Sequence, residues 1–183
     1  MQGEIFVRFS PQELDDLDWA ARKATMRSAH IPNPTRRDLS KTQAEADWIG
    51  LASEWSVASM FGLSIRNCGT YLKGMEMDGG RDLALPCGRS VQVKGIQLRT
   101  NTNHPMWFAL ENTTPRLGAD FGVLVLIRKD RESARIVGYT TRLHFIARGR
   151  VLDLGTGARF GIRADRMLPM NEWPPLKWRR KYA

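Results

Sequence analysis

The sequence predicts a single α/β domain, on three observations. Residues 42–62 repeat apolar side chains at helical spacing, residues 81–98 alternate apolar and polar side chains around a tight turn, and residues 121–127 form an apolar run of strand length. The chain has 183 residues, of which 42% are hydrophobic. This content suffices for one core and is small for two domains, so residues 1–183 are expected to fold as one unit.

The N-terminal segment is predicted to form a strand and then a helix. Residues 4–9 read as the strand. Ser10 fits an N-cap, Pro11 the first helical position and Glu13 the acidic third position, so the helix is expected to run to about Ala29. Residues 30–40, with two prolines, are expected to be a loop. Residues 1–40 are therefore interpreted as a helical accessory cap on a core at residues 42–140.

The next helix, at residues 42–62, carries a candidate functional acid. Its apolar residues cover more than half of its surface. They are Ala44, Trp48, Leu51, Ala52, Trp55, Ala58, Met60 and Phe61. Glu54 lies beside this apolar stripe, where a carboxylate needs a partner such as a metal ion or a lysine. Glu45 and Asp47 lie nearer the helix start, which favours acids, and are interpreted as structural.

Residues 81–98 are predicted to form a β-hairpin. Pro86 presets φ for the first position of a type I turn, and Gly88 suits the left-handed position that ends a three-residue loop. The loop then closes between Leu85 and Arg89.

This closure sets the register of the hairpin. Asp82 comes to lie opposite Gln92, and Lys94 shares their face because side chains alternate along a strand. Val91 and Val93 point to the other face. A polar triad of Asp82, Gln92 and Lys94 is therefore expected within a few ångströms.

The remainder of the chain is predicted to be mainly β. Residues 106–110, 120–128 and 134–139 read as strands, and residues 113–118 as a turn or a short helix. Residues 149–163 are rich in glycine and are expected to form a short hairpin. Neither repeats nor low-complexity segments occur.

Several short motifs occur in an order that resembles the PD-(D/E)XK nuclease superfamily, over about residues 42–140. They are Gly50-x-x-x-Glu54-x-x-x-Ala58 with Gly62, Gly80-Arg81-Asp82, Val91-Gln92-Val93-Lys94-Gly95, Ala119-Asp120-Phe121-Gly122-Val123-Leu124-Val125, and Val137-Gly138-Tyr139-Thr140-Thr141. The resemblance implies a restriction-endonuclease-like core of order α-β-β-β-α-β, with a mixed central sheet flanked by helices. It also implies a metal-dependent DNA endonuclease of the phage, restriction or recombination and repair type.

The resemblance assigns roles to the candidate residues. Glu54 and Asp82 would bind Mg²⁺ or Mn²⁺, and the Gln92 amide and Val93 carbonyl would complete the ligands. Lys94 would remain protonated beside two carboxylates, orient the attacking water and stabilise the transition state. Gln92 stands where most members carry Glu or Asp, so weaker metal binding is expected and the use of two metals is left open. The proline that names the family is replaced by Arg81.

The positive charge is concentrated in the C-terminal extension, residues 141–183. From residue 142 onward, ten Lys or Arg oppose three acids, a net +7 of the chain's +9. These cations, with the aromatic rings of the tail, are predicted to contact nucleic acid. The predicted contacts are Arg142, Arg148, Arg150, Arg159, Arg163, Arg166, Lys177, Trp178, Arg179, Arg180, Lys181 and Tyr182.

Other features narrow the class of protein. Cys68 and Cys87 have no CxxC partner, and the three His are scattered, so neither a zinc site nor a disulfide framework is indicated. Neither a signal peptide nor a membrane span is recognised, and a reduced cytoplasmic location is expected.

Two other classes stay open at this point. A catalytically inactive nuclease fold would use the basic face to bind DNA or a partner, and a small interaction protein would use the tail tryptophans as anchors. DNA is the expected substrate, with RNA left open. Cutting both strands usually takes two sites, which favours a homodimer, but no segment marks an interface.

Overall fold

The computed structural model describes residues 3–28, 41–72, 81–98, 105–110, 113–153 and 157–176. In chain order the helices and strands are β1 (Ile5–Arg8), α1 (Pro11–Ser28), α2 (Gln43–Ala58), α3 (Gly69–Leu72), β2 (Leu83–Ala84), β3 (Ser90–Gln97), β4 (Trp107–Leu110), β5 (Phe121–Ile127), β6 (Ser133–Thr141), α4 (Arg142–Arg148), β7 (Arg150–Asp153) and β8 (Ala158–Arg163). Short 3₁₀ turns follow α2 at Ser59–Phe61, precede α3 at Ile65–Asn67, and occur at Ala164–Arg166 and Met170–Glu172.

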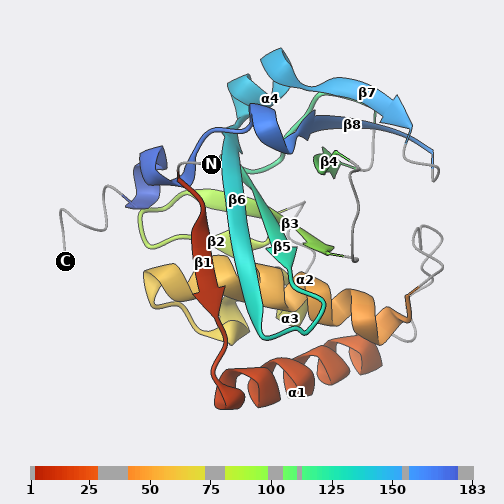
Figure 1. Ribbon diagram of the computed structural model, residues 1–183, viewed down its shortest axis with the longest axis vertical. Coiled ribbons are helices and arrows are strands. Elements are labelled where there is room, and N and C mark those ends of the chain that lie inside the picture. The colour runs from red at the N-terminus through yellow and green to blue at the C-terminus, as the bar shows by residue number, and fades with distance from the viewer. Residues whose placement is uncertain are drawn as a thin grey trace.

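A five-stranded mixed sheet organises the molecule, with strand order β1-β6-β5-β3-β2. β3 and β5 run parallel, and the other neighbouring pairs are antiparallel. Every residue of β5 is buried, as expected for a central strand covered on both faces. Helices lie on one side of the sheet and a smaller sheet on the other (Figure 1). The predicted α/β class with a mixed sheet is confirmed.

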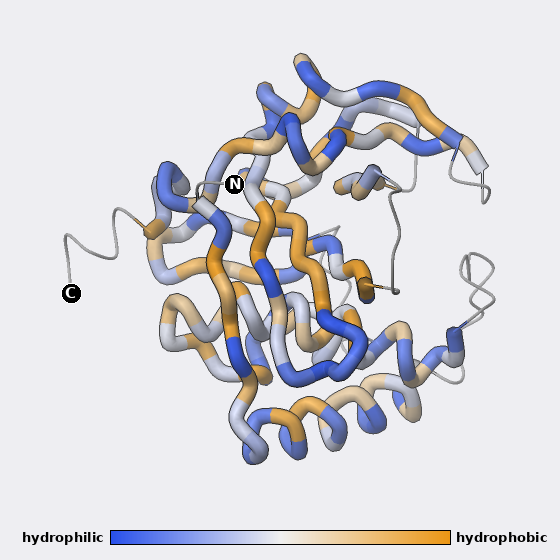
Figure 2. The backbone as a smooth tube through the Cα atoms, viewed as in Figure 1, coloured by the Kyte–Doolittle hydropathy of each residue, from blue (hydrophilic) through white to orange (hydrophobic). Residues whose placement is uncertain are grey.

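The helical layer consists of α1 and α2, which pack against each other. Ser10 caps α1, since the Glu13 amide donates to Ser10 Oγ (3.3 Å) and the Ser10 amide to Glu13 Oε2 (2.7 Å). Thr42 and Glu45 form the same capping box at the start of α2. Both helices begin where the sequence predicted. Hydrophobic residues alternate with hydrophilic ones along α1, and the β5–β6 turn is strongly hydrophilic (Figure 2).

α2 lies unusually close to β3, because the strand has a glycine at the crossing. A Cβ on Gly95 would be 2.2 Å from Ser53 Oγ and 3.0 Å from the Ile49 carbonyl oxygen. Hydrophobic residues of α1, α2 and the near face of the sheet, including Val91 and Val93, form the larger core. Gly95 therefore sets how far α2, and Glu54 upon it, lies from the sheet.

A second, three-stranded sheet of order β4-β8-β7 packs with α4 on the opposite face. Phe108, Leu124, Phe145, Phe160 and Ile162 belong to the smaller core between the two sheets. The hairpin predicted at residues 149–163 is confirmed as β7–β8. The helix α4 was not predicted from the sequence.

The chain between β3 and β5 differs in part from the order implied by the resemblance. β4 pairs with β8 and not with β3. Residues 113–118 form no helix, so the turn alternative holds for this segment. The N-terminal segment, interpreted as a cap, contributes β1 to an edge of the main sheet through pairing with β6.

The predicted hairpin register is confirmed. Leu83 lies opposite Val91, and the Leu85 amide donates to the Arg89 carbonyl oxygen at 2.8 Å. Gly88 has φ of 77°, the left-handed conformation expected at the end of the loop.

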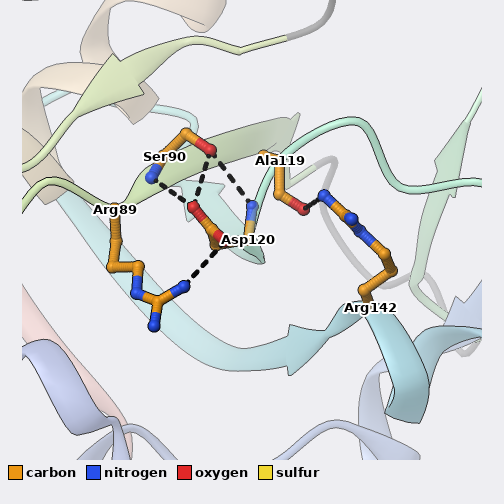
Figure 3. Close-up of polar contacts among 5 residues, drawn as sticks. All are labelled: Arg89, Ser90, Ala119, Asp120 and Arg142. Carbon is orange, nitrogen blue, oxygen red and sulfur yellow. Dashed lines mark hydrogen bonds and ion pairs between the residues drawn. The ribbon is translucent and has the colours of Figure 1, made fainter.

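Asp120 joins the first residues of β3 and β5. Its Oδ2 accepts from the Ser90 amide (2.9 Å) and the Ser90 hydroxyl (3.0 Å), and its Oδ1 accepts from Arg89 (3.2 Å) (Figure 3). The Ser90 backbone bond, then the Ser90 hydroxyl and Arg89, hold the pKa of Asp120 below its usual value despite some burial. Beside it, Arg142 donates to the Ala119 carbonyl oxygen at 3.5 Å, so the start of α4 is tied to the same end of the sheet.

In the described ranges, no helix combines the length and the apolar character that crossing a bilayer requires.

Gly95→Ala is expected to destabilise the protein by about 2 kcal/mol, because the added methyl group overlaps buried atoms of α2. Urea unfolding measures the change. Ser53→Ala removes the nearest atom, so the double variant should recover part of the loss. Equal stability of Gly95→Ala and the parent protein would contradict the close approach of α2.

Asp120→Asn should lower stability at neutral pH by about 1 kcal/mol through loss of charge-assisted hydrogen bonds. Because the pKa of Asp120 is depressed in the folded state, its ionised form stabilises the fold above the unfolded value of about 3.9. This contribution is lost as the pH falls through the folded-state pKa. Denaturant titrations of both proteins at pH 7 and at about pH 3 should therefore show the difference shrinking in acid. A gap that stays constant would contradict this role.

Candidate functional site

Glu54 is buried on α2, with 4% of its surface exposed. The Thr70 amide donates to Glu54 Oε2 at 2.8 Å, and the Thr70 hydroxyl donates to Glu54 Oε1. Gly50, one turn earlier on α2, makes room for this contact: a Cβ there would be 3.0 Å from Thr70 Oγ1. The Gly50-x-x-x-Glu54 spacing therefore has a structural purpose, since it lets α3 approach the carboxylate.

Asp82 lies immediately before β2, where the ladder with β3 ends. Its amide donates to the Val91 carbonyl oxygen at 2.9 Å, and its Oδ2 accepts from the Val93 amide at 2.6 Å. The Asp82 carboxylate thus accepts the hydrogen bond of the Val93 amide, which a backbone carbonyl would accept if the β2–β3 ladder continued. By strand geometry the Val93 carbonyl points to this same edge. The Asp82 carbonyl oxygen accepts from the Gly69 amide at 2.8 Å.

Two consecutive residues of α3 connect the segments that carry the two acids. Gly69 donates to the backbone carbonyl oxygen of Asp82 and Thr70 donates to the carboxylate of Glu54, and neighbouring Cα atoms are only about 3.8 Å apart. Cys68 precedes them and is fully buried. Burial raises the pKa of the Cys68 thiol strongly, and the charges of Glu54 and Asp82 raise it further. The thiol is therefore neutral and lies within the field of both carboxylates.

The side chains of Gln92 and Lys94 project from the face of the sheet opposite to α2. Gln92 is in register with Gly122, where a Cβ would meet Phe108 of the smaller core, and Lys94 is in register with Leu124 of that core. Both side chains are half-buried. They neighbour Asp82 as the register predicts, but their face is opposite to the one covered by α2 and Glu54. Convergence of all four side chains therefore requires that they meet around the edge of β3.

The oxygen donors predicted for this site suit a hard divalent cation. The carboxylates of Glu54 and Asp82, the Gln92 amide and the Val93 carbonyl are all oxygen donors, which Mg²⁺ and Mn²⁺ accept. A carboxylate oxygen that accepts one hydrogen bond keeps a second lone pair for a metal. Within the described part of the chain, no group of three or more His, Cys, Asp or Glu forms a metal-binding cluster. The amide and the backbone carbonyl would thus have to complete the site.

The arginines predicted to contact phosphates have different environments. Arg142, Arg148 and Arg166 are exposed. Arg150 is exposed and lies over the Trp107 ring, with 5.0 Å between its Cζ and the ring centroid. The Arg163 guanidinium makes two hydrogen bonds to the Asp165 carboxylate, which raise its pKa.

Arg159 departs from the prediction of an exposed phosphate contact. Its side chain is 9% exposed, which leaves little of the guanidinium for a ligand. The tail residues Lys177, Trp178, Arg179, Arg180, Lys181 and Tyr182 lie outside the described residues.

Sequence reasoning missed the residues that bond to the two acidic residues, Gly69 and Thr70, and Cys68 beside them. Cys68 follows a 3₁₀ turn, and Gly69 and Thr70 begin a four-residue helix; both elements are too short for any periodic pattern. The available signals were the Ser64-x-x-Asn67 capping box and the run of small residues that follows it. Neither signal indicates contact with Glu54 or Asp82.

A comparison with protein-family models gave no match, and comparisons with curated proteins and with solved structures gave no significant match. The site therefore rests on its geometry.

Iodoacetamide is expected to alkylate Cys87 in the native protein and to leave Cys68 unmodified. Cys87 is exposed at the hairpin turn, whereas Cys68 is buried with a raised pKa. Peptide mass spectrometry after labelling at about pH 8, with and without denaturant, measures both sites. Cys87→Ser provides the control that reports on Cys68 alone. Native labelling of Cys68 as fast as Cys87 would contradict the buried environment.

Proposed function

We propose that this protein is a metal-dependent nuclease that hydrolyses phosphodiester bonds in DNA, with a restriction-endonuclease-like core of the PD-(D/E)XK type. The observation that carries the proposal is that neighbouring residues of α3 contact two acidic residues that are distant in sequence: Gly69 donates to the backbone carbonyl oxygen of Asp82, and Thr70 donates to the carboxylate of Glu54. Its support from the sequence is the ordered set of motifs around the same acids.

In this proposal Glu54, Asp82, Gln92 and the Val93 carbonyl hold Mg²⁺ or Mn²⁺ at the edge of β3. When bound, the ion would supply a water of lowered pKa and neutralise charge on the phosphoryl oxygens. Thr70 and the Val93 amide fix the two carboxylates, so the ligands are oriented before substrate arrives. Lys94 reaches the edge from the other face, orients the attacking water and stabilises the added negative charge of the transition state.

The exposed cations Arg142, Arg148, Arg150 and Arg166 bind the phosphate backbone in this proposal. Such contacts release counterions, so affinity should fall steeply with salt. A homodimer would supply a second site for cutting both strands of a duplex.

A second candidate, a catalytically inactive nucleic-acid-binding module of the same fold, is favoured by one observation. Both Glu54 oxygens already accept hydrogen bonds from Thr70, so this acid has a structural role in the absence of a metal. The neutral Gln92 also gives the site one charge fewer than an acid would. Cleavage assays distinguish the two candidates.

The purified protein is expected to nick circular duplex DNA and circular single-stranded DNA with Mg²⁺ or Mn²⁺ and to be inactive with chelator. Circles have no ends, so any cleavage is endonucleolytic. Asp82→Asn keeps an acceptor for the Val93 amide but removes the charge, and Lys94→Ala removes the ammonium group. Each should reduce the cleavage rate by about 100-fold or more.

Glu132→Ala and Lys129→Ala are matched controls, since both residues are exposed in the β5–β6 turn. They should cleave like the parent protein. Full activity of Asp82→Asn would remove Asp82 from catalysis. Absence of cleavage at any metal concentration, with DNA binding retained, would replace the nuclease by the binding module.

A further inference from the structure

A group of exposed and half-buried aromatic and cationic side chains lies on α1 and α3, outside the residues assigned so far. The rings of Trp19 and Tyr71 stack with 6.5 Å between centroids and 26° between planes. Lys23 Nζ lies 4.2 Å from the Trp19 centroid, and Arg27 Cζ lies 5.0 Å from the Tyr71 centroid. These four residues are termed the α1–α3 aromatic patch.

The patch is ordered, but it is not core. Trp19 is 49% exposed, and Tyr71 is half-buried. Trp19, Lys23 and Arg27 follow one another at four-residue intervals, so they share one face of α1. Arg27 also donates to the Tyr71 carbonyl oxygen at 2.6 Å, which fixes α3 against α1. The result is an ordered pair of aromatic rings that is partly open to solvent and lined by two cations.

The patch and the candidate site share α3, because Tyr71 of the patch follows the two residues that bond to Asp82 and Glu54. Tyr71 directly follows Thr70, whose amide and hydroxyl hold Glu54. Gly69, one residue earlier, bonds to Asp82. α3 therefore connects the patch to the segments that carry both acidic residues.

We propose that the α1–α3 aromatic patch binds unpaired bases, so that the site acts on single-stranded nucleic acid or on single-stranded segments of a larger substrate. The inference rests on the proposed nuclease function and names its substrate class. Stacking on an aromatic ring needs an open base face, which a base in a continuous duplex does not offer. Lys23 can leave the Trp19 ring for a phosphate, because a surface cation–π contact is weaker than base stacking.

The charges of α1 also orient the strand. Asp15, Asp16 and Asp18 are exposed on the turn before Trp19, whereas Arg22 and Lys23 are exposed after it. Phosphates are repelled by the first group and attracted by the second. The bound strand therefore leaves Trp19 toward the C-terminal half of α1.

The test measures binding of fluorescein-labelled oligothymidine, oligouridine and a duplex of the same length by anisotropy, in chelator. The protein carries Asp82→Asn, so that no substrate is cut. Adding Trp19→Ala should weaken binding of the single strands about tenfold and change duplex binding less than about twofold, while Trp19→Phe should retain most of the affinity because it keeps a ring. Equal loss for both single strands identifies stacking as the cause, whereas loss for one alone shows that the 2′-hydroxyl group or the thymine methyl group is also read.

Phe6→Ala on β1 and Leu143→Ala on α4 are matched controls, since these apolar side chains are 74% and 81% exposed. Neither should change single-strand binding. Circular dichroism melting checks that Trp19→Ala is folded, and Lys23→Ala, which removes only an exposed cation, provides a second variant expected to weaken single-strand binding.

The outcomes separate this inference from the nuclease function. Undiminished single-strand binding by folded Trp19→Ala would overturn the patch, even if Mg²⁺-dependent cleavage is found. Loss of single-strand binding without any cleavage by the protein with Asp82 intact would support the patch and overturn the nuclease. Loss of single-strand binding together with faster cutting of single-stranded than duplex circles would support both.

Discussion

The close crossing of α2 over β3 is the constraint on which the rest of the arrangement depends. With no side chain at Gly95, the helix comes near enough for Ser53 and Ile49 to touch the strand. Glu54 is then buried beside a strand edge that already carries Asp82. Because two carboxylates in one partly buried region repel each other, the fold has to supply hydrogen-bond donors. The Thr70 amide and hydroxyl donate to Glu54, and the Val93 amide donates to Asp82.

Local rules predicted those features whose causes are local. The hairpin loop fixes its own register through the backbone preferences of Pro86 and Gly88, so the position of Asp82 opposite Gln92 followed from the sequence alone. Ser10 with Glu13 likewise placed the start of α1. The burial of Glu54 was anticipated from the apolar stripe around it. These features need no knowledge of the tertiary fold.

Contacts between residues distant in sequence could not be predicted from these local rules. β4 has an ordinary strand pattern, and only its pairing with β8 shows that it leaves the main sheet. The four residues of α3 carry no periodic signal, yet they connect both acids. The opposite faces of Glu54 and Lys94 also became visible only once Val91, Val93 and Gly95 were seen beneath α2. Arg159 was placed among exposed cations from composition, which says nothing of burial.

The position of β1 has a consequence for how the chain reaches this fold on the ribosome. Ile5 lies opposite Ile136 in the sheet, so β1 stays unpaired until β6, more than a hundred residues later, has been made. Its apolar residues would meanwhile be open to the wrong partners, which makes this segment a natural client of chaperones. The edge of the sheet at β1 therefore cannot be completed before β6 has been made.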